Sequence, residues 1–123
     1  MTVPRTPTPM RIVHCDDSES VRRLVELFLR PLPAVEIVEQ VGSHAEAIAC
    51  AASLQPHLVL LDLDAGRDDQ VVERLREVCS ARVLILSGLT DVAGDPIVEQ
   101  ADGFVAKAAG AQGIARAVLA VSD

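Results

Sequence analysis

Short continuous apolar runs alternate along the chain with longer stretches of helical periodicity. The short runs are typical of strands buried on both faces of a parallel sheet, and the longer stretches repeat apolar residues every three or four positions, as one face of a helix does. The runs predict strands at residues 10–15, 35–41, 57–63, 81–88 and 103–107. The longer stretches predict helices at residues 16–30, 43–55, 68–80 and 111–121. This alternation indicates an α/β fold, a doubly wound parallel sheet of five strands with helices on both faces.

The segment between the fourth and fifth predicted strands breaks the helical pattern. Gly94 and Pro96 exclude a long helix there. Asp95 is a suitable cap for a short helix that has Pro96 at its first position. We therefore expect a fourth helix of little more than one turn. The second helix has a clearer beginning, because Ser43 and Glu46 have the spacing of a capping box.

The composition adds detail to this picture. Of the 123 residues, 50% are hydrophobic, but the chain has two Phe and neither Trp nor Tyr, so we expect one domain with an aliphatic core. Prolines recur among the first nine residues, with threonines between them, which indicates a flexible tail at residues 1–9. The domain proper is then expected at residues 10–123.

Charge and cysteine usage exclude some classes of function. The net charge of −7 argues against a nucleic-acid-binding surface, which needs a basic patch. The 3 cysteines form no CxxC pair, so they indicate reduced thiols of a cytoplasmic protein rather than a zinc site or a disulfide framework. No apolar run approaches the ~20 residues of a membrane span, and the first residues lack the apolar stretch of a signal peptide.

Polar residues stand at the ends of four of the predicted strands. Asp16 and Asp17 follow the first strand, and Asp62 stands at the end of the third. Ser87 ends the fourth strand and Lys107 the fifth. Because the carboxyl ends of parallel strands meet at one edge of the sheet, these side chains should share one crevice. Clustered carboxylates repel by ~4 kcal/mol per pair at ~4 Å and an effective dielectric of ~20. Mg²⁺ removes that repulsion, and the crevice then suits a phosphoryl group.

Each of these residues also has an ordinary structural interpretation. Asp16 and Asp17 suit the beginning of a helix. Asp64 and Ser87 suit turns. Lys107 suits a solvated loop, yet it is the only lysine among the 11 Lys and Arg residues, which hints at a need for a compact point charge. The combination of these residues, in this order and at these strand ends, supports the phosphoryl site more than any one of them does.

With these residues in place, the sequence resembles the receiver domain of two-component response regulators, the CheY-like family. The resemblance runs from about residue 10 to residue 121 and rests on the stretches HCDDSES, HLVLLDLD, VLILSG and ADGFVAK. It implies a five-stranded parallel sheet in the order 2-1-3-4-5. It also implies a histidine kinase or a phosphotransfer protein as phosphoryl donor, and a downstream protein or an effector domain outside this chain as the output. A homodimer is a further option in this family.

The resemblance implies a role for each acidic residue. Asp62 matches the phosphoacceptor, a nucleophile that becomes an aspartyl phosphate. Asp16 and Asp17 match the acidic pair that holds Mg²⁺, with Asp17 favoured as the direct ligand. Asp62 and the backbone carbonyl of Asp64 would complete the metal site, and the Asp64 side chain would influence how fast the phosphoryl group hydrolyses.

The resemblance also assigns the residues that respond to the phosphoryl group. Lys107 and Ser87 match the lysine and the hydroxyl that bind phosphoryl oxygens, and Phe104 matches the aromatic switch residue. In the family these groups shift together between two populated states. The domain is then a signalling switch that assists its own phosphorylation and dephosphorylation, and it is not otherwise an enzyme.

The sequence departs from the family pattern in several loops. Residues 65–67, Ala-Gly-Arg, replace the usual Met-Pro-Gly, and Gln70 and Gln100 replace glycines. Ala108 follows Lys107 where the family has a proline behind a cis bond. A cis bond without proline costs ~3 kcal/mol, so we expect a trans or strained bond and a looser lysine loop. The segment that holds helix four is also shorter than usual, which reduces the family's output surface of helix four, strand five and helix five.

Two other functions compete with this interpretation. A phosphate-independent pseudo-receiver would keep the fold as a protein-interaction module, and the altered loops favour it while the intact acidic pocket does not. A haloacid-dehalogenase-like phosphatase would use the DLD stretch at residues 62–64 as its Asp-x-Asp signature. In that family the signature comes before the acidic pair, whereas here Asp16 and Asp17 come first, which argues against it.

Overall fold

A computed structural model describes residues 8–89 and 91–121 of the chain. Five strands form one parallel sheet in the order β2-β1-β3-β4-β5, which confirms the predicted doubly wound α/β fold. The strands are β1 (Met10–Cys15), β2 (Val35–Val41), β3 (Leu58–Asp62), β4 (Arg82–Ser87) and β5 (Gly103–Ala106). Of the tail expected at residues 1–9, only Thr8 and Pro9 belong to the described residues.

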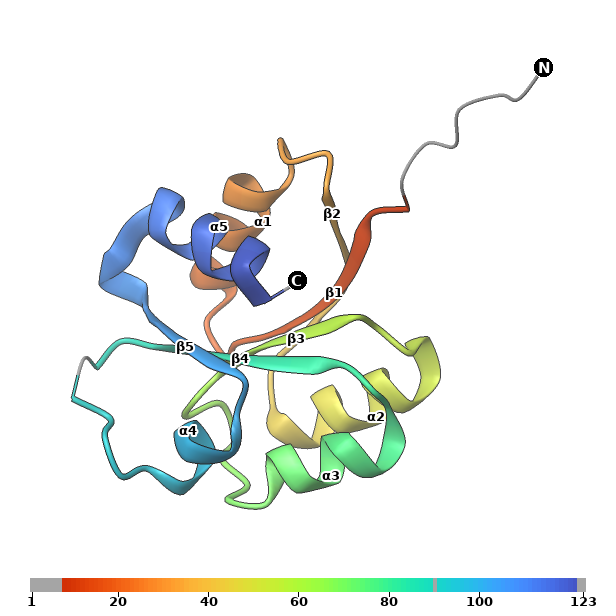
Figure 1. Ribbon diagram of the computed structural model, residues 1–123, viewed down its shortest axis with the longest axis vertical. Coiled ribbons are helices and arrows are strands. Elements are labelled where there is room, and N and C mark those ends of the chain that lie inside the picture. The colour runs from red at the N-terminus through yellow and green to blue at the C-terminus, as the bar shows by residue number, and fades with distance from the viewer. Residues whose placement is uncertain (1–7, 90, 122–123) are drawn as a thin grey trace.

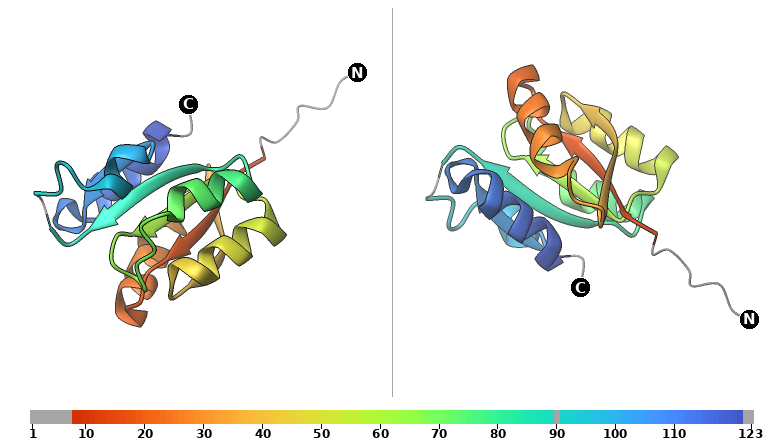
Figure 2. Two further views of the ribbon diagram at one scale, coloured as in Figure 1. Left: turned by 90° about the horizontal axis from the view of Figure 1, so that it is seen from below. Right: turned by 90° about the horizontal axis from the view of Figure 1, so that it is seen from above.

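Helices cover both faces of the sheet, as Figures 1 and 2 show. One face carries α1 (Glu19–Leu29) and α5 (Gly110–Val121), and the other carries α2 (His44–Leu54), α3 (Val71–Val78) and α4 (Pro96–Gln100). A single 3-10 turn, Lys107–Ala109, joins β5 to α5. Within the described ranges, none of the helices combines the length and the apolarity that crossing a membrane requires.

The central strand β3 is buried on both faces. Leu58 and Leu60 belong to the apolar cluster beneath α1 and α5, whereas Val59 and Leu61 belong to the cluster beneath α2 and α3. Successive side chains of a strand point to opposite faces, so a strand covered on both faces must be apolar throughout. The strand therefore holds its last residue, Asp62, on a rigid and fully packed support.

Two helices begin later than the sequence pattern predicts. The helix predicted from residue 16 begins at Glu19, because Ser18 is its cap and accepts a hydrogen bond from the first turn. Asp16 stays in the loop before the helix, where its Oδ1 accepts a hydrogen bond from Ser18 N at 2.9 Å. The helix predicted from residue 68 begins at Val71. Because both helices begin later, the loops that follow β1 and β3 are longer than predicted. These loops carry acidic residues of the candidate site.

The predicted helix caps agree with the structure. Oγ of Ser43 accepts a hydrogen bond from Glu46 N at 3.2 Å at the beginning of α2. α4 has 5 residues, with Pro96 at its beginning and Asp95 as its cap. Oδ1 of Asp95 accepts a hydrogen bond from Ile97 N at 3.0 Å. The short fourth helix is thus a local consequence of its capping residues and of the chain that precedes it.

Candidate functional site at the carboxyl edge of the sheet

The carboxyl ends of four strands carry the predicted site residues. Asp16 and Asp17 follow β1, and Asp62 ends β3. Ser87 ends β4, and Lys107 follows β5. Asp16, Asp17 and Asp62 each place one carboxylate oxygen within 4.8 Å of the other two. Nζ of Lys107 lies 2.8 Å from Oδ2 of Asp16 and 3.1 Å from Oδ1 of Asp62. The structure therefore sets one ammonium group against two of three clustered carboxylates.

Ser87 and Phe104 are the other predicted residues on β4 and β5. Ser87 is almost fully buried and follows Leu86, the residue that pairs with Asp62 across the sheet. Oγ of Ser87 accepts a hydrogen bond from Leu89 N at 3.0 Å, so the hydroxyl is held by its own loop in this structure. Phe104 is half-buried and packs against the apolar cluster beneath α2 and α3. Its ring is therefore packed against the protein rather than turned into solvent.

Burial and charge determine how this pocket ionises. Asp16 is fully buried and Asp62 nearly so, whereas Asp17 is exposed. Burial raises the pKa of Asp62 above its usual value, the hydrogen bond from Lys107 opposes that rise, and repulsion from Asp16 adds to it. Burial by itself lowers the pKa of Lys107, but hydrogen bonds to Asp16 and Asp62 outweigh burial and raise it. The pocket therefore holds a charged lysine beside a carboxylate that is costly to keep ionised.

The three carboxylates fit a hard divalent cation. Oδ2 of Asp16 is buried, and its contact within the described residues is the 2.8 Å ion pair with Nζ of Lys107. Clustered carboxylate oxygens are the ligands that Mg²⁺ prefers. Burial is the main cause of the raised pKa of Asp62, and a cation there would offset the repulsion from Asp16 that adds to it. The side chain of Asp64 is 66% exposed and stands outside the cluster. Its backbone carbonyl, not its carboxylate, is the group that the resemblance assigns to the metal.

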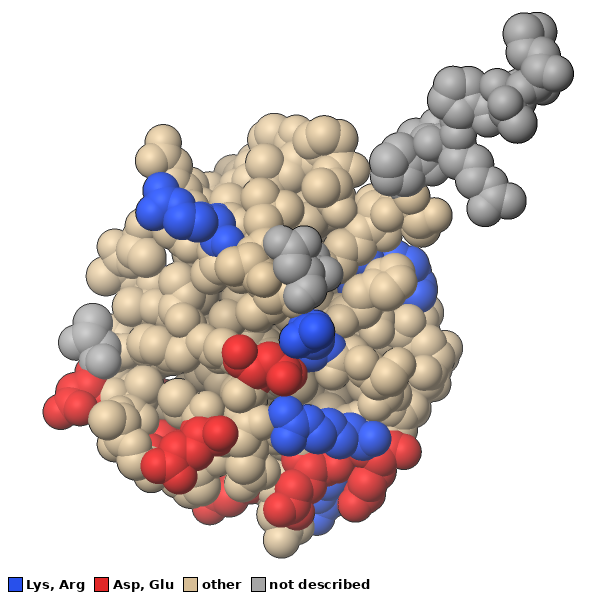
Figure 3. Space-filling view, in the orientation of Figure 1, with Lys and Arg blue, Asp and Glu red and all other residues tan. Residues whose placement is uncertain are grey.

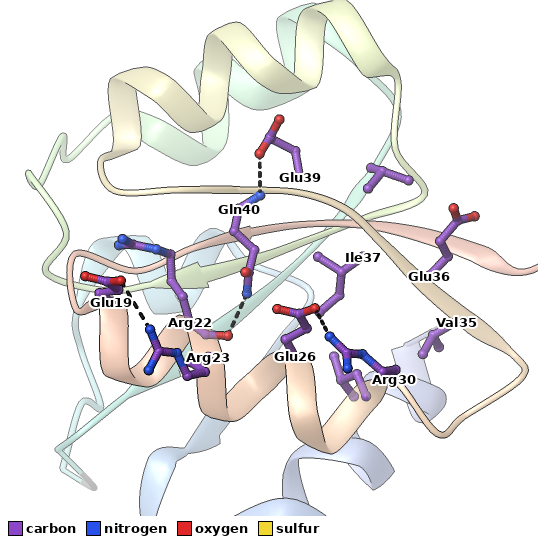
Figure 4. A pocket seen from close by; sticks show the side chains of 12 residues that line it. Glu19, Arg22, Arg23, Glu26, Arg30, Val35, Glu36, Ile37, Glu39 and Gln40 are labelled. Atoms are coloured by element: carbon purple, nitrogen blue, oxygen red, sulfur yellow. Dashed lines mark hydrogen bonds and ion pairs between the residues drawn. The ribbon is translucent and has the colours of Figure 1, made fainter.

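A second set of polar residues supports the loop of Asp16 from the side of α1 and β2. Arg22 donates a hydrogen bond to the Asp16 carbonyl at 2.6 Å, and the Arg22 carbonyl accepts one from Nε2 of Gln40 at 2.7 Å. Gln40 also lies 3.0 Å from Nδ1 of His14, whose pKa burial lowers to about 4. Figure 4 shows Arg22 and Gln40 in the groove between α1 and β2. Asp62 and Lys107 do not line that groove, so it is separate from the acidic pocket.

The loop between β3 and α3 is held by contacts that the sequence pattern did not reveal. Arg67 donates two hydrogen bonds of 2.9 Å to the Asp95 carboxylate and one of 2.6 Å to Asp69. Because these bonds favour the charged forms, they raise the pKa of Arg67 and lower that of Asp95. His44 of α2 is fully buried and binds the backbone of the same loop through both ring nitrogens.

These contacts explain how the altered loop keeps a defined shape. The stretch at residues 65–67, which departs from the family pattern, contributes Arg67 as a bridge to the cap of α4. Figure 3 shows basic side chains interleaved with acidic ones where α3 lies, whereas the charged side chains where α4 lies are acidic. The only sequence signal for the bridge was one arginine inside an acidic stretch, and that signal is too common to be specific.

The lysine loop differs from the family pattern as its sequence predicts. No cis peptide bond occurs within residues 8–89 and 91–121, so the Lys107–Ala108 bond is trans. Lys107 opens a 3-10 turn, and Ala108 within that turn is exposed. The turn still delivers Nζ of Lys107 to the carboxylates of Asp16 and Asp62.

Sequence comparison relates the chain to parts of longer proteins. It is 31% identical over 87 residues to a protein-glutamate methylesterase/protein-glutamine glutaminase of Agrobacterium fabrum, a match that covers 69% of this chain and 25% of that protein. It is 32% identical over 115 residues to the DNA-binding transcriptional activator DevR/DosR of Mycobacterium tuberculosis, a match that covers 89% of this chain and 52% of that protein. The chain thus spans about half or less of the length of these relatives. No family model matches it.

Solved structures share the fold over nearly the whole chain. The signal receiver domain of the response regulator NarL of Mycobacterium tuberculosis superposes with a TM-score of 0.86 at 27% identity, covering 94% of this chain and 98% of that one. The response regulator domain of Thermotoga maritima CheB superposes with a TM-score of 0.78 at 20% identity, covering 94% of each chain. The second likeness concerns the fold alone. The strand order and the placement of the helices in this chain agree with the receiver fold of the first neighbour.

Proposed function

We propose that this chain, a receiver domain of the kind found in two-component response regulators, takes a phosphoryl group onto Asp62 from a histidine kinase or a phosphotransfer protein. The observation that carries the proposal is the position of Lys107, whose Nζ lies 2.8 Å from Asp16 and 3.1 Å from Asp62 within a cluster of three carboxylates. A fixed ammonium beside a buried carboxylate suits the arrival of an anionic group. The free cysteines are compatible with action in the reducing cytoplasm.

In the transfer, a carboxylate oxygen of Asp62 attacks the phosphorus of the donor phosphohistidine. The new O–P bond forms as the P–N bond breaks, and the donor imidazole leaves with the electron pair of that bond. Lys107 and Ser87 then hydrogen-bond the phosphoryl oxygens. Mg²⁺, held by Asp16, Asp17 and Asp62 with the backbone carbonyl of Asp64, would neutralise charge on the incoming group. The packed strand β3 keeps the Asp62 carboxylate aimed at the donor without rearrangement.

The same residues connect the acidic pocket to a partner-binding surface. A phosphoryl group that draws in the Ser87 hydroxyl breaks its hydrogen bond with Leu89 N, and the connection between β4 and α4 moves. Phe104, packed on the neighbouring strand, then changes its rotamer with that connection. Because α4 has only 5 residues, the output surface consists mainly of β5 and α5. A downstream protein, an effector domain of a longer chain or a second copy of this chain would bind there.

Effector domains of different kinds are compatible with this role. The relatives named above are a methylesterase and a DNA-binding activator, and the chain matches only part of each. The receiver itself is a switch whose chemistry is limited to gaining and losing its own phosphoryl group. Which effector it controls is a separate property from the chemistry of the acidic pocket.

Intact-mass spectrometry after incubation with Mg²⁺ and acetyl phosphate tests the proposal. The wild-type chain should gain one phosphoryl group, and Asp62→Asn should gain none while keeping the same circular dichroism spectrum. An adduct that persists in Asp62→Asn would place the acceptor on another residue. Failure of the wild-type chain to accept phosphoryl from acetyl phosphate and from purified histidine kinases would favour a phosphate-independent interaction module.

A further inference from the structure

His44, the first residue of α2, is fully buried against the segment that carries Asp62. Its Nδ1 lies 3.0 Å from the backbone nitrogen of Asp68, and its Nε2 lies 2.8 Å from the backbone oxygen of Asp62. A backbone N–H can only donate and a carbonyl can only accept, so the ring is the Nε2–H tautomer. Nδ1 then accepts the hydrogen bond from Asp68, and Nε2 donates one to Asp62.

The beginning of α2 makes further contacts with the middle of the loop between β3 and α3. The backbone nitrogen of His44 donates a hydrogen bond to the Ala65 carbonyl at 2.9 Å. Gly66 has φ of +56°, and a Cβ at this position would lie 3.1 Å from Cβ of Ser43, so the loop passes close against the beginning of α2. The loop is therefore attached to α2 at residue 62, at residues 65–66 and at residue 68. The backbone carbonyl of Asp64 lies between these attachment points.

We infer that His44 is a positioning residue for the acidic pocket, because its ring fixes the backbone on both sides of Asp64 and the peptide plane that follows Asp62. This inference rests on the proposed function of Asp62. The ring orients two groups that it does not touch, the Asp62 carboxylate and the Asp64 carbonyl. The hydrogen bond to the Asp62 carbonyl is buried and the one from Asp68 N is partly buried, and both are made to backbone atoms, so a side chain without matching donor and acceptor leaves a backbone group unpaired. No local sequence motif suggested this role, because the partners of His44 are 18 and 24 residues away.

Two variants separate the two hydrogen bonds of the ring. In His44→Asn the amide oxygen can take the place of Nδ1 and accept from Asp68, but the donor to Asp62 is lost. In His44→Gln the amide nitrogen can take the place of Nε2 and donate to Asp62, but the acceptor for Asp68 is lost. Leu58→Val is the matched control, because Leu58 is buried at the opposite end of β3 and its truncation lowers stability without touching the loop.

The variants are compared with the wild-type chain by three measurements, the urea midpoint, the rate of labelling by acetyl phosphate, and the Mg²⁺ concentration that gives half of the maximal rise in Tm. His44→Asn should slow labelling and weaken Mg²⁺ binding by about tenfold or more. His44→Gln should lose less of both, and Leu58→Val should lower the urea midpoint without changing either. Labelling and Mg²⁺ binding that are unchanged in both His44 variants would overturn the inference.

The failure of the proposed function is distinguishable from the failure of this inference. If the wild-type chain is not labelled, the proposed function fails, and the Mg²⁺ titration alone then decides whether His44 orients the carboxylates. If the His44 variants do not fold, nitrogen-15 NMR of the wild-type ring decides: a protonated Nε2 with an unprotonated Nδ1 supports the inference, and the opposite tautomer or a doubly protonated ring overturns it.

Discussion

Replacing Lys107 with methionine tests the electrostatics of the acidic pocket. Methionine keeps most of the aliphatic side chain and removes the ammonium group, which lies 2.8 Å from Asp16 and 3.1 Å from Asp62. Each contact is worth roughly 5 to 6 kcal/mol by Coulomb's law at an effective dielectric of ~20. The Lys107 side chain is 27% exposed, so screening and the recovered hydration of lysine reduce the net loss. We expect Lys107→Met to lose about 2 to 4 kcal/mol at pH 7, a fall in Tm of roughly 8 to 15 °C.

Urea unfolding and thermal melts in EDTA at pH 7 measure this loss. The matched control is Arg23→Met, which removes one positive charge from an ion pair with Glu19 whose two side chains are 73% and 77% exposed. Exposed pairs of this kind contribute little to stability, so the control should melt close to the wild-type Tm. A similar fall in both variants would assign the effect to net charge rather than to the acidic pocket.

Acid and Mg²⁺ should both restore stability to Lys107→Met. The folded-state pKa of Asp62 is already raised by burial, and removal of Lys107 raises it further. A carboxyl with a raised folded-state pKa favours folding below that pKa and costs stability as pH rises through it. The difference in free energy of unfolding between Lys107→Met and the wild-type chain should therefore become smaller as pH falls below 7. Millimolar Mg²⁺ should also make this difference smaller at pH 7. A variant as stable as wild type, or a gap that neither condition changes, would refute the reasoning.

Further predictions concern the metal, the lysine and the loop bridge. Mg²⁺ should raise the Tm of the wild-type chain, because a Mg²⁺ concentration of 100 times Kd adds about 2.7 kcal/mol to the free energy of unfolding. The rise in Tm should be smaller in Asp62→Asn, and equal rises in the two proteins would place the ion elsewhere. Lys107→Arg should keep most of the stability but impair phosphoryl-dependent partner binding, because a planar fork does not replace a point charge; unchanged binding would contradict this. Asp95→Asn keeps the helix cap and removes the charge opposite Arg67, so it should destabilise by about 1 kcal/mol at low salt. The pKa of Asp95 is lowered by that pair, so its stabilisation is present above the ordinary aspartate pKa and is lost as pH falls through the folded-state value. If the wild-type chain remained more stable than Asp95→Asn at low pH, the charge of Asp95 would not be the source of the difference in stability.

Local patterns determined much of this molecule without knowledge of the fold. The continuous apolar run at 58–61 required a strand covered on both faces, and that in turn placed Asp62 at the carboxyl edge. The short α4 also follows from local chemistry, because Asp95 caps it and Pro96 fits only its first turn. Lys107 stood out in the sequence as the only lysine. In each case the deciding interaction lies within a few residues of the chain, so the sequence displays both partners together.

The tertiary structure decided the features whose partners are far apart in sequence. The sequence pattern alone extends the first helix to Asp16, yet the fold keeps Asp16 in the loop, where Arg22 holds its carbonyl and Lys107 its carboxylate. His44 looks like an ordinary first-turn residue until folding buries it against the backbone of residues 62–68. The bridge from Arg67 to Asp95 spans 28 residues of sequence and forms only when α4 packs beside that loop. Periodicity records which face of an element is buried, but not which polar atom a buried donor or acceptor meets, because that meeting depends on the packing of all the layers together.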